Sequence, residues 1–299
     1  MEATPPHKAG FIALAGLPNV GKSTLMNALL KFKFSIVSHK PQTTRHKILG
    51  ILEGEGFQAC FLDTPGLIDS PSDSLQKALR RESSRAIRDD ADLVVYMVDA
   101  AEADPGAVEG TPVREGTPLI LVLNKTDRVV AEARLLKLEE AYAAALKPLK
   151  ILRISALKGA GVEELRNEIV ARLPENPAFY EKGHLSDRWE RFFAEEIVRE
   201  QVFERYHDEI PHAVAVVVDS FREQQGKPDE VFVTLFVERD GQKGILIGKG
   251  GKDLHALTER AQAGLENFLG RPVHLEIWIK VRKDWRKDER SLKEFGYTS

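Results

Sequence analysis

The chain is poor in cysteine, which limits the chemistry that it can perform. Cys60 is the single cysteine among 299 residues, so an internal disulfide and a metal cage of cysteines are both excluded. It lies in an apolar stretch, where we expect a small buried core residue. This cysteine usage is typical of the reducing cytosol, and we expect a cytoplasmic location.

Long apolar runs and an excess of charge are also lacking. No run approaches the ~18 apolar residues of a membrane-spanning helix, and residues 1–10 lack the apolar segment of a signal peptide. We therefore expect any membrane contact to be peripheral. The formal net charge of −3 does not by itself indicate nucleic-acid binding, so such a function has to rest on local groups of cations.

What the chain does have is an alternation of short apolar runs and helical patterns over residues 11–173. The runs are nearly continuous in apolar residues, as expected of strands that are covered on both faces. This alternation predicts a doubly wound α/β domain with a mainly parallel sheet. The expected strands are residues 11–16, 58–64, 92–100, 118–125 and 150–156, with 47–54 as a further strand at the edge.

A different pattern begins after residues 173–183, which contain two prolines and a glycine and interrupt the alternation. The later segments predict a smaller α+β domain. Its elements are a helix that carries Trp189, Phe192, Phe193 and Ile197, strands at 212–221 and 230–239, a glycine loop, a helix at 252–269 and a strand at 273–281. We expect one domain at residues 1–176, a linker at 177–184 and a second domain at 185–299.

Residues 16–24, GLPNVGKST, contain the pattern G-x-x-x-x-G-K-[ST] between a predicted strand and a predicted helix. The backbone N–H groups of such a loop point at phosphate oxygens, and the helix N-terminus adds its dipole. We expect Lys22 to neutralise phosphate charge and Ser23 to bind Mg²⁺. The expected phosphate-binding residues are Gly16, Leu17, Pro18, Asn19, Val20, Gly21, Lys22, Ser23 and Thr24.

Three later motifs, each at the end of a predicted strand, distinguish GTP from ATP. In DTPG, Asp63 can hold Mg²⁺ through water, and the backbone N–H of Gly66 can sense a γ-phosphate. In NKTD, the Asp127 carboxylate can accept both N–H groups of the guanine edge, a pair that adenine does not offer. In SAL, backbone amides can meet the guanine oxygen. The expected residues are Asp63, Thr64, Pro65, Gly66 and Leu67, then Asn124, Lys125, Thr126 and Asp127, then Ser155, Ala156 and Leu157.

These motifs, in this order, resemble the translation-factor-related GTPases and specifically the Era-like group. In that group a threonine after the first helix binds Mg²⁺ when GTP is present. Thr43 and Thr44 both qualify, and we favour Thr44 because it directly precedes Arg45. The resemblance implies the metal ligands Ser23, Thr44 and Asp63, and it implies that Lys22, Thr44 and Gly66 take part in hydrolysis.

The motif DTPG is followed by Leu67, where Ras-like GTPases have a glutamine that orients the attacking water. Leucine has no donor or acceptor for this task, so we expect slow intrinsic turnover. In related GTPases an asparagine at the position of Asn19 helps to hold a K⁺ ion. The alternative is that Asn19 only stabilises the turn of the loop.

The second glycine-rich loop, residues 247–251, lacks the spacing of the first and has no serine or threonine after its lysine. It reads G-x-x-G, the clamp with which a KH domain grips about four nucleotides of single-stranded RNA. The order of a first helix, two strands, loop, helix and strand matches the type II KH variant. The alternative is a plain turn in a small α+β domain. The expected RNA-binding residues are Ile247, Gly248, Lys249, Gly250, Gly251, Lys252, Lys280, Arg282 and Lys283.

A P-loop GTPase domain followed by a KH domain is the layout of the Era family, and the resemblance extends from about residue 8 to the C-terminus. It implies a monomeric assembly factor that binds single-stranded small-subunit ribosomal RNA near its 3′ end. It also implies peripheral association with the inner membrane. The alternative is a signalling or membrane-associated GTPase whose second domain binds protein or lipid, although the final residues FGYTS carry no lipidation signal. A metabolic P-loop kinase is disfavoured by NKTD.

Overall fold

The structure is a computed structural model that describes residues 7–36, 40, 43–67, 70–106, 113–186 and 190–297. The chain divides into two units. The first is Met1–Ser70 with Leu79–Asp187, and the second is Pro71–Ala78 with Arg188–Ser299. By this division, helix α2, Ser74–Arg85, begins in the second unit and ends in the first.

The first unit is built on a six-stranded sheet in the order β2-β3-β1-β4-β5-β6. Only β2 runs antiparallel to its neighbour, and it lies at the edge. The predicted mainly parallel sheet and its edge strand are thus confirmed. The strands are β1 (Lys8–Ala15), β2 (Ile48–Gly54), β3 (Phe57–Asp63), β4 (Leu93–Asp99), β5 (Leu119–Asn124) and β6 (Lys150–Arg153).

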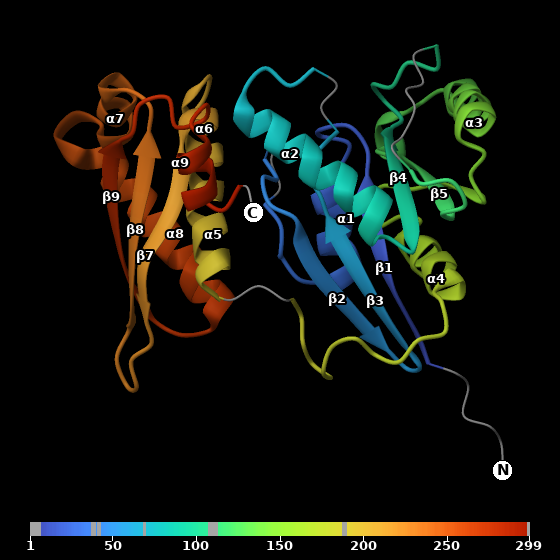
Figure 1. Cartoon of the computed structure of the whole chain (residues 1–299), viewed down its shortest axis with the longest axis horizontal. Helices are drawn as coiled ribbons and strands as arrows, with labels where there is room; N and C mark the ends of the chain where they lie inside the picture. Colours follow the sequence, from blue (N-terminus) through green and yellow to red (C-terminus); the bar gives the residue numbers. More distant parts are fainter. Residues whose placement is uncertain are drawn as a thin grey trace. The chain divides into compact units, whose positions relative to one another are not determined.

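Helices cover both faces of this sheet, with α1 and α2 on opposite sides (Figure 1). Every residue of β3, β4 and β5 is buried, which accounts for their continuous apolar sequence. The helices and short helical turns are α1 (Lys22–Leu30), η1 (Ala86–Asp90), η2 (Thr126–Arg128), α3 (Glu132–Leu146) and α4 (Val162–Arg172). The first unit is therefore the doubly wound α/β domain that the sequence predicts.

The proline-containing segment after α4 contacts the first unit through hydrogen bonds and a ring stack. The Gln58 side chain donates to the carbonyl of Tyr180 and accepts from the N–H groups of Phe179 and Tyr180. The Phe179 ring stacks on Phe11 with the ring centroids 5.0 Å apart. The segment therefore follows the surface of β3. The division into residues 1–176, 177–184 and 185–299 stays a prediction.

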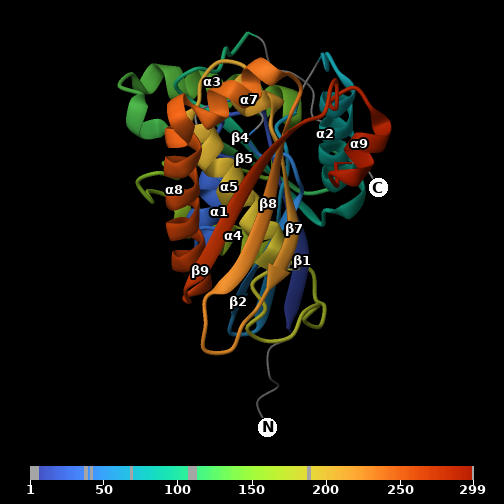
Figure 2. The ribbon, with the colours of Figure 1, turned by 90° about the vertical axis from the view of Figure 1, so that its left-hand side faces the viewer.

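The second unit has a three-stranded sheet in the order β7-β8-β9, in which β7 and β8 are antiparallel and β8 and β9 are parallel. Figure 2 shows the three strands in front of α5, with α8 beside β9. Apolar residues from both helices and all three strands form one core. The elements are α5 (Glu190–Arg205), α6 (Ile210–Ala213), β7 (Ala215–Arg222), β8 (Asp229–Val237), α7 (Asp240–Ile247), η3 (Lys249–Gly251), α8 (Lys252–Leu269), β9 (Val273–Val281) and α9 (Glu289–Glu294).

Three helices of the second unit are missing from the prediction: α6, which occupies the start of the strand expected at 212–221, α7 and α9. The sequence predicts that β8 leads straight to the glycine loop, whereas helix α7 lies between them. Its first turn is fixed by Gln242, whose side-chain oxygen accepts from the N–H groups of Glu238 and Arg239. The two glycines in α7 weaken its helical pattern and hide it in the sequence. Trp189, predicted at the start of α5, lies outside the described residues.

Candidate functional site

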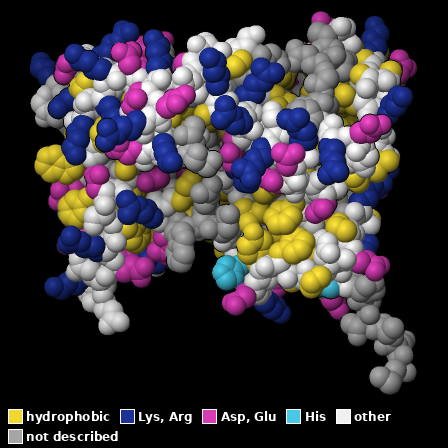
Figure 3. Space-filling model, viewed as in Figure 1, with side chains coloured by type: hydrophobic (Ala, Val, Ile, Leu, Met, Phe, Trp, Pro, Cys, Tyr) yellow, Lys and Arg dark blue, Asp and Glu magenta, His cyan; other side chains and the backbone are white. Residues whose placement is uncertain are grey.

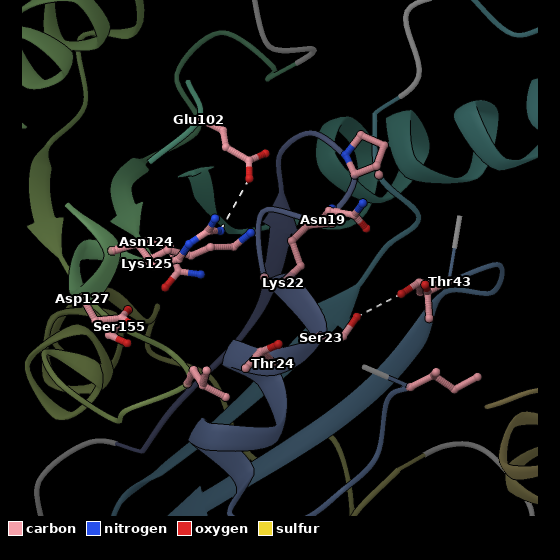
Figure 4. A pocket seen from close by; sticks show the side chains of 17 residues that line it. Asn19, Lys22, Ser23, Thr24, Thr43, Glu102, Asn124, Lys125, Asp127 and Ser155 are labelled. Carbon is pink, nitrogen blue, oxygen red and sulfur yellow. Dashed lines mark hydrogen bonds and ion pairs between the residues drawn. The ribbon is translucent and has the colours of Figure 1, made fainter. Parts of the chain in front are cut away.

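A cavity of about 490 Å³ lies in the first unit where the carboxyl ends of the parallel strands meet. Its size suits a nucleotide. Figure 4 shows residues of the first glycine loop in the middle and those of NKTD and SAL at one end. The predicted residues that line it are Pro18, Asn19, Gly21, Lys22, Ser23, Thr24, Thr44, Gly66, Asn124, Lys125, Asp127, Ser155 and Leu157.

The first glycine loop is braced by the asparagine of NKTD. The Asn124 side chain donates to the carbonyl of Val20 over 2.7 Å and accepts from the N–H of Ala156 over 2.9 Å. Gly21 has a φ of 101°, and a Cβ there would lie 2.3 Å from the Asn124 amide nitrogen. Asn124 therefore links three of the four motifs, namely the first loop, NKTD and SAL. The Ala156 N–H, which was expected to meet the guanine oxygen, donates to Asn124.

Lys22 is buried at the base of the loop, with 6% of its surface exposed. Its ammonium group donates to the carbonyls of Gly16 and Leu17 over 3.1 and 2.9 Å. Burial lowers the pKa of Lys22 to about 8, and the nearby Asp63 carboxylate opposes part of this shift. The lysine that is expected to hold phosphate charge therefore titrates close to neutral pH in the free protein.

This lowered pKa predicts how nucleotide affinity depends on pH. Phosphates stabilise the protonated lysine, so the pKa in the complex lies above its value of about 8 in the free protein. GTP affinity is then fully present below about pH 8 and falls about tenfold per pH unit above it, until the pKa of the complex is reached. Titrations of GTP between about pH 7 and 9 measure this slope. Lys22→Met is the control, and an equal slope in that variant would assign the effect to other groups.

Three oxygen-bearing side chains meet beside Lys22. The Ser23 hydroxyl donates to the Asp63 carboxylate over 2.7 Å and lies 2.9 Å from the Thr44 hydroxyl oxygen. The Thr43 hydroxyl donates instead to the carbonyl of Lys40 over 2.6 Å. Mg²⁺ prefers oxygen ligands and binds through few protein groups together with phosphates and water. The three residues fit that ion, and the arrangement supports the choice of Thr44.

The DTPG segment lies directly against the first loop. A Cβ on Gly66 would come within 2.6 Å of the Pro18 backbone, so only glycine fits there. The Leu67 N–H donates to the carbonyl of Gly16, and the Leu67 side chain packs on the core beside β4 and β5. Leu67 thus points away from the cavity and cannot orient water. Thr64 and Pro65 help to stabilise the fold around the cavity. The Thr64 hydroxyl donates to the Leu14 carbonyl, and the Pro65 carbonyl accepts from the Ser83 hydroxyl.

The opposite end of the cavity is formed by the turn η2, which carries Asp127. The Thr126 hydroxyl donates to the carbonyl of Ile154 and fixes this turn to the end of β6. Lys125 pairs with Asp99 over 2.6 Å. The Asp127 carboxylate is exposed and has no ion pair or hydrogen bond with any residue that the structure describes. It is therefore available to a ligand.

Sequence reasoning missed three residues that line this cavity, namely Ile36, Glu102 and Arg128. Arg128 directly follows NKTD, so its position was a usable signal. Glu102 lies in the loop after β4 and has no motif around it. The two form an exposed ion pair over 3.5 Å at the cavity mouth (Figure 4).

The second unit contains a groove of about 520 Å³ between α7, α8 and the edge strand β9. The predicted residues Ile247 and Gly251 line it. Gly248, Gly250 and Gly251 all have positive φ, at 69°, 64° and 78°. A Cβ on Gly250 would meet no atom within 4 Å, so this turn is open to solvent. The glycine clamp and the groove thus adjoin each other.

The predicted RNA-binding cations differ in their exposure and in the contacts that they make. Lys249, Lys252, Lys280 and Lys283 are exposed. Arg282 pairs with Glu294 over 2.8 Å and lies over the Phe295 ring, so its guanidinium already holds α9. Figure 3 shows cations mixed with Asp and Glu across the visible face, a pattern unlike a broad basic surface. Lys243, a further cation that the sequence places around the glycine loop, also lines the groove. Groove residues that the prediction missed are Leu254, His255, Thr258, Leu275, Glu276, Ile277, Trp278 and Ile279.

Comparisons with known proteins cover both units. Residues 11–125 match the family model for a 50S ribosome-binding GTPase, and residues 209–286 match that of the KH domain. GTPase Era of Lactobacillus delbrueckii subsp. bulgaricus is 43% identical over 299 residues, which cover 99% of this chain and 98% of that protein.

Two solved structures are similar over nearly the whole chain. One is Era in complex with MgGDPNP and nucleotides 1506–1542 of 16S ribosomal RNA, with a TM-score of 0.92 and 35% identity over 98% of this chain and 100% of that one. The other is an Aquifex aeolicus Era variant bound to GDP·AlF4−, with a TM-score of 0.91 and 34% identity over 98% of this chain and 100% of that one. Since both units match in order and a relative is this similar along its whole length, the chain belongs to the Era family of GTPases.

Proposed function

We propose that this GTPase binds single-stranded RNA near the 3′ end of the small-subunit ribosomal RNA and assists maturation of the small ribosomal subunit. The observation that carries the proposal is the groove of the second unit, which adjoins an exposed G-x-x-G turn with Lys249 in it. The similar Era structure that contains 16S ribosomal RNA supports this class of ligand.

The residues of the first cavity take the roles that their positions suit. Asp127 accepts from guanine, and Lys22 holds the phosphates within the braced loop. Ser23, Thr44 and Asp63 hold Mg²⁺, which neutralises phosphate charge when bound. Gly66 lies against the loop and can present its N–H to the γ-phosphate. Because Leu67 packs into the core, hydrolysis is slow unless the water is positioned by another group.

The RNA ligand is tested by fluorescence anisotropy with a labelled oligonucleotide of the 16S 3′ end. We expect this single strand to bind at least tenfold more tightly than the same strand annealed to its complement, because the groove admits unpaired bases. A scrambled oligonucleotide is the control for sequence preference. Equal affinity for the duplex would contradict the proposal, and binding to lipid or protein alone would favour the signalling alternative.

The location and assembly state stay predictions. No helix within the described residues is both long and apolar enough to cross a membrane. We retain a cytoplasmic monomer with peripheral contact to the inner membrane as our proposal. Vesicle flotation and light scattering after size-exclusion chromatography measure these two properties.

A K⁺ ion is the proposed second cation. Asn19 lines the cavity and has a φ of 64°, which an asparagine adopts more easily than most residues. We expect GTP turnover to be several-fold faster in K⁺ than in Na⁺. Asn19→Gly keeps this backbone conformation and removes the side chain, so it should bind GTP normally and lose the K⁺ preference. If the variant keeps the preference, Asn19 only stabilises the turn.

A further inference from the structure

An exposed tryptophan stands on the edge strand of the second unit. Along β9, Val273, Leu275, Ile277 and Ile279 are buried, whereas the alternate residues His274, Glu276, Trp278 and Lys280 face the other side of the strand. Trp278 has 59% of its surface exposed. By contrast, Trp285 is fully buried and its indole N–H donates to the carbonyl of Ala213.

A single exposed apolar residue is common on protein surfaces, so exposure alone carries little weight. Trp278 also lines the groove that adjoins the G-x-x-G turn. Directly across the sheet from it is Thr234, whose hydroxyl donates to Asp219 over 2.6 Å. Among the residues that the structure describes, no aromatic ring or cation stacks on the indole. Trp278 thus combines a place among the groove-lining residues with a large exposed ring that has no stacking partner in the described part of the chain.

Trp278 has a positively charged neighbour in one direction along its strand face and a negatively charged neighbour in the other. Lys280, two residues along the same strand face, is exposed. Glu276, two residues in the other direction, lies 3.4 Å from His274 and carries the charge that repels phosphate. A nucleotide with its base on Trp278 thus gains a favourable phosphate contact on the Lys280 side only. An aromatic ring beside a cation is the combination with which proteins bind single-stranded nucleic acid.

We propose that Trp278 is a stacking platform for one RNA base at the end of the groove, with Lys280 contacting the adjoining phosphate. This inference rests on the proposed RNA-binding function and adds to it. A KH clamp grips about four nucleotides through their backbone, whereas stacking on an indole tolerates any base. The site therefore extends by one nucleotide, with little preference for its identity.

The test compares Trp278→Ala with Trp278→Phe in the full-length protein. We expect alanine to lower the affinity for the single-stranded 16S 3′-end oligonucleotide about tenfold, and phenylalanine to retain most of it. RNA should also quench the tryptophan fluorescence of the unchanged protein. In Trp278→Phe this quenching should disappear, although Trp189 and Trp285 remain. Ile245→Ala is the matched control, since Ile245 is also exposed (51%) but is not among the residues that line the groove.

Shortening the oligonucleotide one nucleotide at a time locates the stacked base. At one length the unchanged protein should lose about tenfold in affinity, and Trp278→Ala should lose nothing further at that step. If the unchanged protein binds the RNA and Trp278→Ala binds it equally, the platform is overturned while the proposed function stands. If the unchanged protein binds no single-stranded RNA, the proposed function fails and the platform with it. An equal loss in Ile245→Ala would also overturn the assignment to Trp278.

Discussion

Two carboxylates in the G-x-x-G turn should abolish most RNA binding and leave the nucleotide site intact. We expect the variant Lys249→Asp, Gly250→Asp to bind the single-stranded 16S 3′-end oligonucleotide at least tenfold more weakly, or about 1.4 kcal/mol. Both residues are exposed, and a Cβ at Gly250 meets no other atom. Aspartate tolerates the positive φ of 64° at Gly250 better than most residues do. The loss therefore comes from repulsion of phosphates and from blocked approach, not from misfolding.

The matched control for this variant is Lys249→Gln, Gly250→Asn, which adds the same bulk without negative charge. It should lose less affinity than the aspartate pair, because only the approach is blocked and one cation is lost. Titrations with RNA and with GTP are made in parallel with thermal melts. Unchanged RNA affinity in the aspartate pair would show that the loop is only a turn. A joint fall of RNA affinity, GTP affinity and Tm would contradict our expectation that the fold survives.

Guanine selection by Asp127 should give the second large effect. We expect Asp127→Asn to weaken GTP binding by at least about a hundredfold, because two hydrogen bonds to a charged acceptor contribute about 1.5–3 kcal/mol each. Binding of xanthosine triphosphate should improve, since the amide nitrogen can donate to the extra carbonyl of xanthine. The carboxylate is exposed and makes no bond to the described part of the chain, so the fold should not change.

Competition titrations with GTP, ATP and xanthosine triphosphate measure this switch. Glu102→Gln is the control, because Glu102 lines the same cavity and its ion pair with Arg128 is exposed. That variant should keep its preference for guanine. If Asp127→Asn binds GTP as well as the unchanged protein does, the carboxylate does not read the base.

Much of the fold followed from local pattern. The strands of the first sheet were predictable because short, continuous apolar runs are typical of strands that are covered on both faces. The nucleotide site was predictable because its motifs follow the ends of parallel strands, which lie at one edge of the sheet. The helix α7 was not predictable, because its glycines weaken the helical pattern and Gln242 fixes its first turn through neighbouring N–H groups.

The sequence by itself predicted which residues bear the chemistry, since residue type and spacing are typical of a phosphate loop, a guanine-reading carboxylate and a glycine clamp. Only the tertiary structure decided how these groups behave. Lys22 has a lowered pKa because the fold buries it, and Asn124 braces the loop because the loop after β1 reaches the end of β5. The alternation along β9 placed Trp278 opposite the buried residues. Whether another layer covers that side depends on which elements pack there, and this is a property of the fold that no local pattern encodes.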